Sequence, residues 1–316
     1  MGRVKKQHFV PQFYLRNFSS DGKKLFVYDK SADKEFVSNV SDVASENAFY
    51  DMPEVDPIIG IENFIEKQLH PFEEMGAEAI KKLLSSLKEK RYCRIHPDIK
   101  VDLSLYLAVQ YMRSKETRET MVEMFSKIKK EEFYQFLCNE SPDLNVSRKD
   151  FDIYLEEDKK SAYHSLILTD EDTRVELSGE LHKNYWYIAK NCTNLPLYTS
   201  DQPLVKHGHL DHPIRSMQGF SSPGIEVVFP LSHEYLLIIC DYRTFPHAKK
   251  LGNQIVSIKN EQNIVYYNHL QVHQSYRQIF SNESGFDLAK QIVREEPWVG
   301  DINSPRIHEG IYEIHH

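Results

Sequence analysis

The sequence predicts an α+β fold, with short N-terminal strands, a central helical bundle, and a β-rich C-terminal half with closing helices. The first observation is the order of the patterns, in which strands, helices, strands and a helix follow one another in blocks. A doubly wound sheet would instead alternate strands and helices. The second observation is that the chain has only 12 glycines and no glycine-rich phosphate loop. With 316 residues, of which 41% are hydrophobic, it can bury a large core.

The N-terminal strands are expected in two short runs. Residues 24–28 and 34–40 have the residue types of strands and are separated by a polar turn. A helical pattern follows, because apolar residues from Ile61 to Leu83 recur at intervals of three and four. Pro71 interrupts this pattern and would start a new helix or kink the existing one.

The remaining elements follow from the same patterns. Further helices are expected from His96-Pro97 to Met112, over residues 117–138 and over residues 171–182. The β-rich half starts at residues 185–189, with further strands at 196–199, 225–229 and 235–240. Residues 261–280 and 286–294 return to helix.

We expect residues 1–316 to form a single domain with two halves. The helical half covers about residues 57–182, and the β-rich half combines residues 1–56 with 183–316. Residues 139–160 are polar and contain Ser-Pro, so they are interpreted as a linker or insertion.

The composition argues against several classes of protein. The net charge of −8 argues against a grip on nucleic acid by the whole protein, although a local basic site could still contact it. The four cysteines lie more than forty residues apart, which excludes a zinc knuckle and a disulfide framework. The apolar runs are too short to span a membrane, and no apolar segment of a signal peptide follows the basic start. We expect a cytoplasmic protein with no membrane partner.

Two proline-containing segments carry the first candidate site residues. His8 and Gln12 lie in an aromatic run stiffened by Pro11, and a neutral His can act as a base or a ligand near neutral pH. Asp201 follows a predicted strand, at a position where sites often lie. The alternatives are a buried, hydrogen-bonded His8 and an Asx turn at Asp201. We expect His8, Gln12 and Asp201 to share a pocket.

A helix end and a helix face supply further candidates. Gln110 and Arg113 are three residues apart and share a face, where the Arg113 guanidinium could recognise phosphate or carboxylate. Glu62 and Glu66 are four apart, and carboxylates together with a His suit a hard ion such as Mg²⁺ or Mn²⁺. One of them is expected to face Arg113. A solvated helix face would show the same spacing.

One loop is rich in possible ligands of a transition metal. His207, His209, Asp211 and His212 are crowded together there. The flanking Gly208 favours a mobile loop over a metal site.

The scattered motifs resemble a bacterial family, domain of unknown function 4238. The resemblance rests on the residues His8, Pro11, Gln12, Tyr14, Leu15 and Phe18, on Thr199-Ser200-Asp201, on Gln110 to Arg118, and on Asn268 to Arg277. The family has Asn at the position of Gln202. From the residue types at these matching positions, we expect catalytic roles for His8, Asp201 and Gln12 and ligand binding by Gln110, Arg113 and Asn268. The resemblance implies no reaction, because the family is uncharacterised.

Two functions fit these residues. The first is a metal-dependent phosphodiesterase or nuclease in bacterial defence, in which His8 and the carboxylates hold Mg²⁺ or Mn²⁺ and the arginine clamps phosphate. The alternative is a non-catalytic ligand-binding or sensor protein, whose polar cluster of His, Gln, Arg and Asp receives a small anion or a peptide. A buried structural network is a third interpretation.

Overall fold

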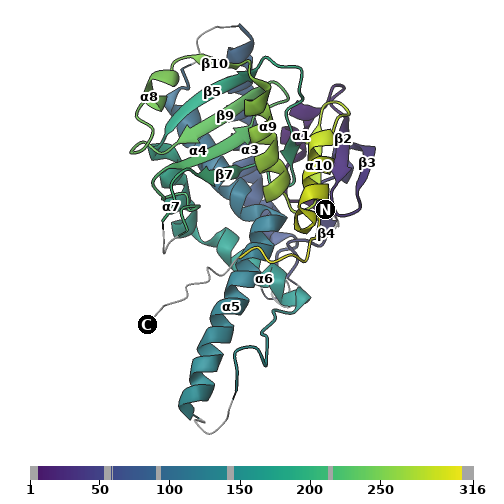
Figure 1. Cartoon of the computed structure of the whole chain (residues 1–316), viewed down its shortest axis with the longest axis vertical. Helices are drawn as coiled ribbons and strands as arrows, with labels where there is room; N and C mark the ends of the chain where they lie inside the picture. Colours follow the sequence, from purple (N-terminus) through teal and green to yellow (C-terminus); the bar gives the residue numbers. More distant parts are fainter. Residues whose placement is uncertain are drawn as a thin grey trace.

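The computed structural model of the chain describes residues 6–52, 58, 60–89, 94–140, 146–212 and 216–307. The α+β fold is confirmed (Figure 1). The strands are β1 (Lys6–His8), β2 (Lys24–Asp29), β3 (Lys34–Asn39), β4 (Ser45–Asn47), β5 (Tyr185–Asn191), β6 (Thr199–Ser200), β7 (Val205–Gly208), β8 (Ile225–Pro230), β9 (Tyr235–Cys240), β10 (Ile255–Ile258) and β11 (Gln278–Ser281). The helices are α1 (Gln12–Leu15), α3 (Phe64–Glu89), α4 (Pro97–Arg113), α5 (Lys115–Glu140), α6 (Glu157–Thr169), α7 (Glu171–Lys183), α8 (Ala248–Leu251), α9 (Glu261–Gln274) and α10 (Asp287–Glu295).

The central sheet has five strands in the order β10-β5-β9-β8-β7, antiparallel except for the β10–β5 pair. Every residue of β8 and β9 is buried, because helices cover both faces of the sheet. Alternate side chains point to opposite faces. Phe229 and Leu237 join the core shared with α3 and α4, whereas Val228 and Leu236 join a second core with Ile264 of α9 (Figure 1).

A second sheet brings together segments that are far apart in the sequence. Its order is β3-β2-β11-β6, and all its neighbouring strands are antiparallel. The short strands β1 and β4 form a separate pair. Because β11 lies between β2 and β6, the N-terminal strands lie beside the chain that follows α9.

The long helices pack on one side of the central sheet. Helix α3 packs against α4, which also packs against α7. Helix α5 continues from α4 and extends away from the body of the molecule (Figure 1). Helix α3 runs through Pro71 without a break, because Ile65 and Leu69 before it and Ile80 and Leu83 after it pack into the same core.

Several predicted boundaries were wrong. Helix α3 begins at Phe64, after Asn63 adopts a positive φ of 53°, so Glu62 precedes the helix and does not stack on Glu66. The predicted helix 261–280 ends at Gln274, because the following residues pair with β2 and β6 as strand β11.

The predicted insertion at 139–160 falls partly outside the described residues. Helix α5 reaches Glu140, and helix α6, which the sequence did not indicate, begins at Glu157. Residues 141–145 are not described. No helix in the described ranges has both the length and the apolar character that a membrane span requires.

The two segments that resembled family motifs meet at Tyr14. Its hydroxyl lies 2.7 Å from Thr199 Oγ1 and donates to the carbonyl of Pro230 at 2.8 Å. Its ring packs on Phe229 with a centroid distance of 4.8 Å. Tyr14 is fully buried, so these polar contacts connect the N-terminal run to both sheets without water.

We expect Tyr14→Phe to lower the free energy of unfolding by about 1–3 kcal/mol, because it leaves Thr199 and the Pro230 carbonyl buried without their partner. Urea unfolding measures this change. Tyr154→Phe is the matched control, because Tyr154 is exposed and its hydroxyl donates to the exposed Asp152 at 3.4 Å. Equal losses in both variants would contradict the prediction.

Candidate functional site

Arg113 and Gln110 bind the backbone of the N-terminal run. The fully buried Arg113 guanidinium donates to the His8 carbonyl, to Glu73 Oε1 and to the Tyr50 hydroxyl. Gln110 Nε2 donates to the Phe9 carbonyl at 3.0 Å. Gln110 Nε2 and the Arg113 guanidinium therefore hold the protein's own chain, whereas the buried Gln110 Oε1 has no hydrogen-bond partner among the described residues. The predicted ligand-binding role of both residues stays a prediction.

The side chains of His8 and Gln12 make local contacts. His8 Nε2 lies 3.2 Å from the Ser41 carbonyl, and burial lowers the pKa of His8. Gln12 accepts a hydrogen bond from Arg16 at 3.0 Å.

Asp201 is buried and holds the chain after α9. Its carboxylate accepts the backbone N–H groups of Tyr276, Arg277 and Gln278, each at 2.8 Å. Burial raises the pKa of Asp201 to about 6, against the opposing effect of these three donors and of Lys30.

Asn268 also binds the backbone. Its side chain accepts from the Tyr198 N–H and donates to the Pro196 carbonyl, both at 2.8 Å. Between described residues, no hydrogen bond or ion pair joins the His8 side chain to Asp201, so their shared catalytic role stays a prediction.

Glu62 and Glu66 differ in their surroundings. Glu62 is exposed, whereas Glu66 is partly buried and its Oε2 lacks a hydrogen-bond partner. Burial raises the pKa of Glu66, although Arg113 lies near enough to oppose this. The ion pair with Arg113 is formed by Glu73. Among the residues searched, neither Glu62 nor Glu66 belongs to a group able to hold a metal.

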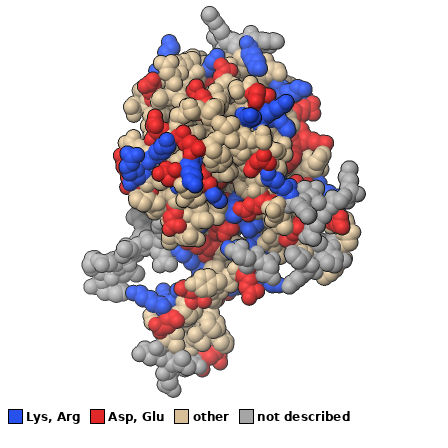
Figure 2. All heavy atoms as spheres, turned by 90° about the vertical axis from the view of Figure 1, so that its right-hand side faces the viewer, with Lys and Arg blue, Asp and Glu red and all other residues tan. Residues whose placement is uncertain are grey.

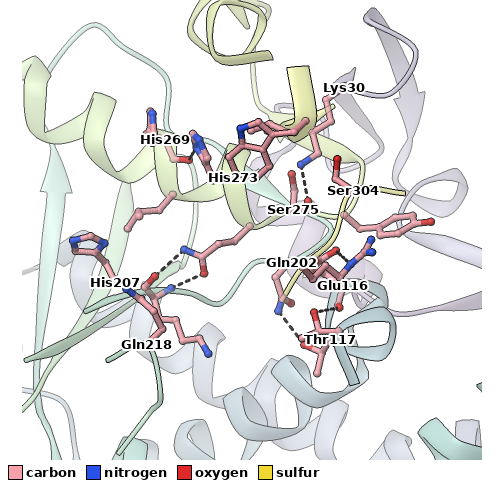
Figure 3. A pocket seen from close by; sticks show the side chains of 18 of the residues that line it. Lys30, Glu116, Thr117, Gln202, His207, Gln218, His269, His273, Ser275 and Ser304 are labelled. Carbon is pink, nitrogen blue, oxygen red and sulfur yellow. Dashed lines mark hydrogen bonds and ion pairs between the residues drawn. The ribbon is translucent and has the colours of Figure 1, made fainter. Parts of the chain in front are cut away.

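The His207 loop likewise forms no such group within the described ranges. Instead, His209 Nε2 lies 2.7 Å from Glu226 Oε2, and this contact raises the pKa of His209. His207 points toward the cavity described next (Figure 3).

A cavity of about 700 Å³ lies where both halves of the chain meet (Figure 3). Its walls come from α5, α9, β7, the turn after β2 and residues 298–306. Its polar lining includes Lys30, Glu116, Thr117, Gln202, Lys206, His207, Gln218, His269, His273, Gln274, Ser275 and Arg306, and its aromatic lining is Tyr111, Tyr266, Tyr276 and Trp298. The volume is within the range of small-molecule sites.

Lys30 is the most unusual group of the cavity. Its side chain is only 4% exposed, and Nζ donates to the carbonyls of Val272 and Ser275 at 2.9 and 2.6 Å. Among the described residues no carboxylate lies within ion-pair distance of this ammonium. Burial lowers the pKa of Lys30 to about 8, although Asp201 and Glu116 favour the charged form.

Two further polar groups lie near Lys30 in the cavity wall (Figure 3). Gln202 Nε2 donates to Thr117 at 3.1 Å, while the buried Gln202 Oε1 has no hydrogen-bond partner among the described residues. Glu116 accepts from Arg306 Nε at 3.0 Å, and burial raises the pKa of Glu116 to about 7.

The sequence did not identify Lys30, Glu116 or the two histidines of α9 as site residues. Lys30 carries no local signal, because it becomes a cavity residue only when β2 pairs with β11. His269 and His273 do carry one, since two His residues four apart share a helix face.

A comparison with known protein families found one match. The model of a family described as "Protein of unknown function (DUF4238)" matches residues 6–285, which is most of the chain. No curated protein and no solved structure shows significant similarity.

We expect Asp201→Ala to lower the free energy of unfolding by about 3 kcal/mol or more, because three backbone N–H groups lose an ionic acceptor. Urea unfolding tests this, with the exposed Asp211→Ala as control. If Asp201→Ala keeps wild-type stability, the catalytic role expected from the sequence gains support instead.

A second prediction concerns pH. The folded-state pKa of Glu116 lies above its ordinary value of 4.5, so its contribution to stability is lost as pH rises from about 4.5 to about 7. The charged groups facing it are Arg306, Lys30 and Asp201. Glu116→Gln cannot ionise, so its stability relative to wild type should improve across this window. Urea unfolding over the pH range measures the difference, and a constant difference would contradict the assignment.

Proposed function

Because the chain belongs to the DUF4238 family of proteins of unknown function, we propose a function from the cavity itself: the protein binds a small organic anion there. The observation that carries this proposal is the Lys30 ammonium. A buried charge is costly unless it is paired. Among the described residues Lys30 bonds only to carbonyls, and Asp201 and Glu116 favour its charge from beyond ion-pair distance. An anion in the cavity would therefore supply a direct ionic partner.

The neighbouring groups support the same class of ligand. Lys206 and Arg306 add two cations to the wall, with Lys206 Nζ bonded to the Tyr111 hydroxyl at 3.0 Å. The unpartnered Gln202 Oε1 suits a hydrogen-bond donor of the ligand. The aromatic rings of Trp298, Tyr266 and Tyr276 would contact an apolar or planar part of it. The proposed ligand therefore combines an anionic group, a donor and a ring.

Phosphodiester hydrolysis is a second candidate. The observation that favours it is the group of cations Lys30, Lys206 and Arg306, which would bind phosphate oxygens. The enclosed volume of about 700 Å³ fits a nucleotide-sized substrate. On the face shown in Figure 2, basic and acidic side chains are interspersed, which does not favour a continuous track for a nucleic-acid backbone there.

The proposal is tested by measuring the thermal shift with a panel of nucleotides, sugar phosphates and aromatic carboxylates, followed by calorimetry. We expect at least one member to raise the melting temperature of the wild type. Lys30→Met should weaken its binding about tenfold or more, because it removes a charge-assisted hydrogen bond. Incubation of the nucleotides with protein tests hydrolysis at the same time.

Lys24→Met is the matched control, because Lys24 begins strand β2, which Lys30 directly follows, and it is exposed. It should bind as the wild type does. Lys206→Met provides a second variant if Lys30→Met does not fold. The proposal is wrong if no member of the panel binds, or if both cavity variants bind as tightly as Lys24→Met.

A further inference from the structure

Three side chains that could hold a metal ion gather at the edge of the cavity. His269 and His273 come from α9, and Glu296 follows the last turn of α10. One ligand atom from each lies within 4.8 Å of the others. Within the described ranges, this is the one group of three or more His, Cys, Asp or Glu residues with such an arrangement.

The fold places these groups together in two steps. His269 and His273 are four residues apart on one face of α9, and their rings stack with a centroid distance of 4.0 Å. Helix α10 packs against α9 and brings Glu296 to His273. The Trp298 ring packs against the His273 ring, with 5.7 Å between the two ring centroids, and so covers one side of the three-residue group.

The hydrogen bonds of His273 indicate a cation at this place. Its Nδ1 lies 3.1 Å from the His269 carbonyl, which can only accept, so Nδ1 carries a proton. Its Nε2 lies 3.2 Å from Glu296 Oε1. In the neutral ring, this nitrogen would direct its lone pair at a carboxylate. A positive charge between the two atoms, either a proton or a metal ion, removes this repulsion.

The imidazole of His269 favours a metal ion over a proton as the positive charge between His273 and Glu296. A proton on His273 satisfies Glu296 alone and leaves His269 stacked against a charged ring. A metal ion accepts lone pairs from both rings and from the carboxylate at once. His269 and His273 both point toward the cavity, so a remaining coordination position would open into it (Figure 3).

We propose that His269, His273 and Glu296 bind a divalent transition metal, with Zn²⁺ as the best candidate. Two His and one Glu form a known type of three-ligand zinc set, which keeps one position for water or a ligand. Tetrahedral zinc with bonds of about 2.0–2.1 Å needs ligand atoms about 3.3 Å apart. Glu296 Oε1 already lies 3.2 Å from His273 Nε2, and all three ligand atoms lie within 4.8 Å of one another, so rotations of the side chains would bring them to this spacing.

The site selects a different metal from the one that the sequence suggested. Imidazole nitrogens favour Zn²⁺ over Mg²⁺, whereas the Mg²⁺ or Mn²⁺ expected at Glu62 and Glu66 would need a set of oxygen ligands. The inference does not rest on the proposed binding of an anion. The two histidines come from α9, whereas Lys30 reaches the cavity wall from the turn after β2 (Figure 3).

The test is titration of the metal-free protein with Zn²⁺ by calorimetry and with Co²⁺ by visible absorption. We expect one Zn²⁺ per chain and the absorption bands of four-coordinate Co²⁺. Glu296→Gln should weaken Zn²⁺ binding about tenfold or more, and the double variant His269→Gln/His273→Gln should abolish it. Mg²⁺ in excess should not compete.

Two control variants separate this site from other histidines and from the anion site. His233→Gln removes a histidine whose ring contacts the Asn17 carbonyl outside the cavity, and it should bind Zn²⁺ as the wild type does. Lys30→Met should also keep full Zn²⁺ affinity, even if it loses the anion. Circular dichroism without metal verifies that each variant is folded.

The proposal is overturned if the wild type binds no Zn²⁺, or if Glu296→Gln and the double variant bind it as tightly as His233→Gln. The second result would mean that Zn²⁺ binds other histidines and that His273 pairs with Glu296 through a proton.

Discussion

The carboxylate of Asp201 fixes the path of the chain between α9 and β11, and the cavity depends on that path. By accepting three consecutive backbone N–H groups from residues 276–278, it turns the chain from a helix into a strand within a few residues. The Ser275 carbonyl is thereby placed where it accepts from Lys30. Strand β11 is placed between β2 and β6, which brings Lys30 to the same wall. The buried carboxylate of Asp201 thus positions both Lys30 and the end of α9 in the cavity wall.

Arg113 has a comparable role at the end of α4. Its three donor groups join Glu73 of α3, Tyr50 and the backbone of His8, so one side chain connects α4 to α3 and to the N-terminal run. A buried guanidinium is stable only when its donors are satisfied, which is why polar residues gather around it. Arg113 therefore needs no ligand to explain it. Buried groups that lack such partners among the described residues, such as Gln202 Oε1 in the cavity wall, are the better indicators of function.

The sequence predicted the fold class and the long elements because their signals are local. The apolar runs of β8 and β9 and the helical periodicity of α4 and α5 can be read within one segment. Strands β1, β4, β7 and β10 were missed, since three or four residues carry little pattern and depend on partners elsewhere. Glu62 was misplaced for a related reason, because the positive φ of Asn63 that delays α3 has no clear sequence signal.

The candidate site could be predicted only in part, because its main residues are charged and a sequence does not show which charged residues are buried. A sequence shows that Lys30, Glu116 and Arg306 are charged, but these residue types are usually exposed. They become candidate site residues only because the fold buries them in a wall built by four distant segments. In this wall, cations and carboxylates alternate in the order Arg306, Glu116, Lys30 and Asp201. Such a row is balanced as long as each charge has a neighbour of opposite sign. Lys30 lies within this row and also lines the cavity, so an anion bound there would add a negative charge beside it.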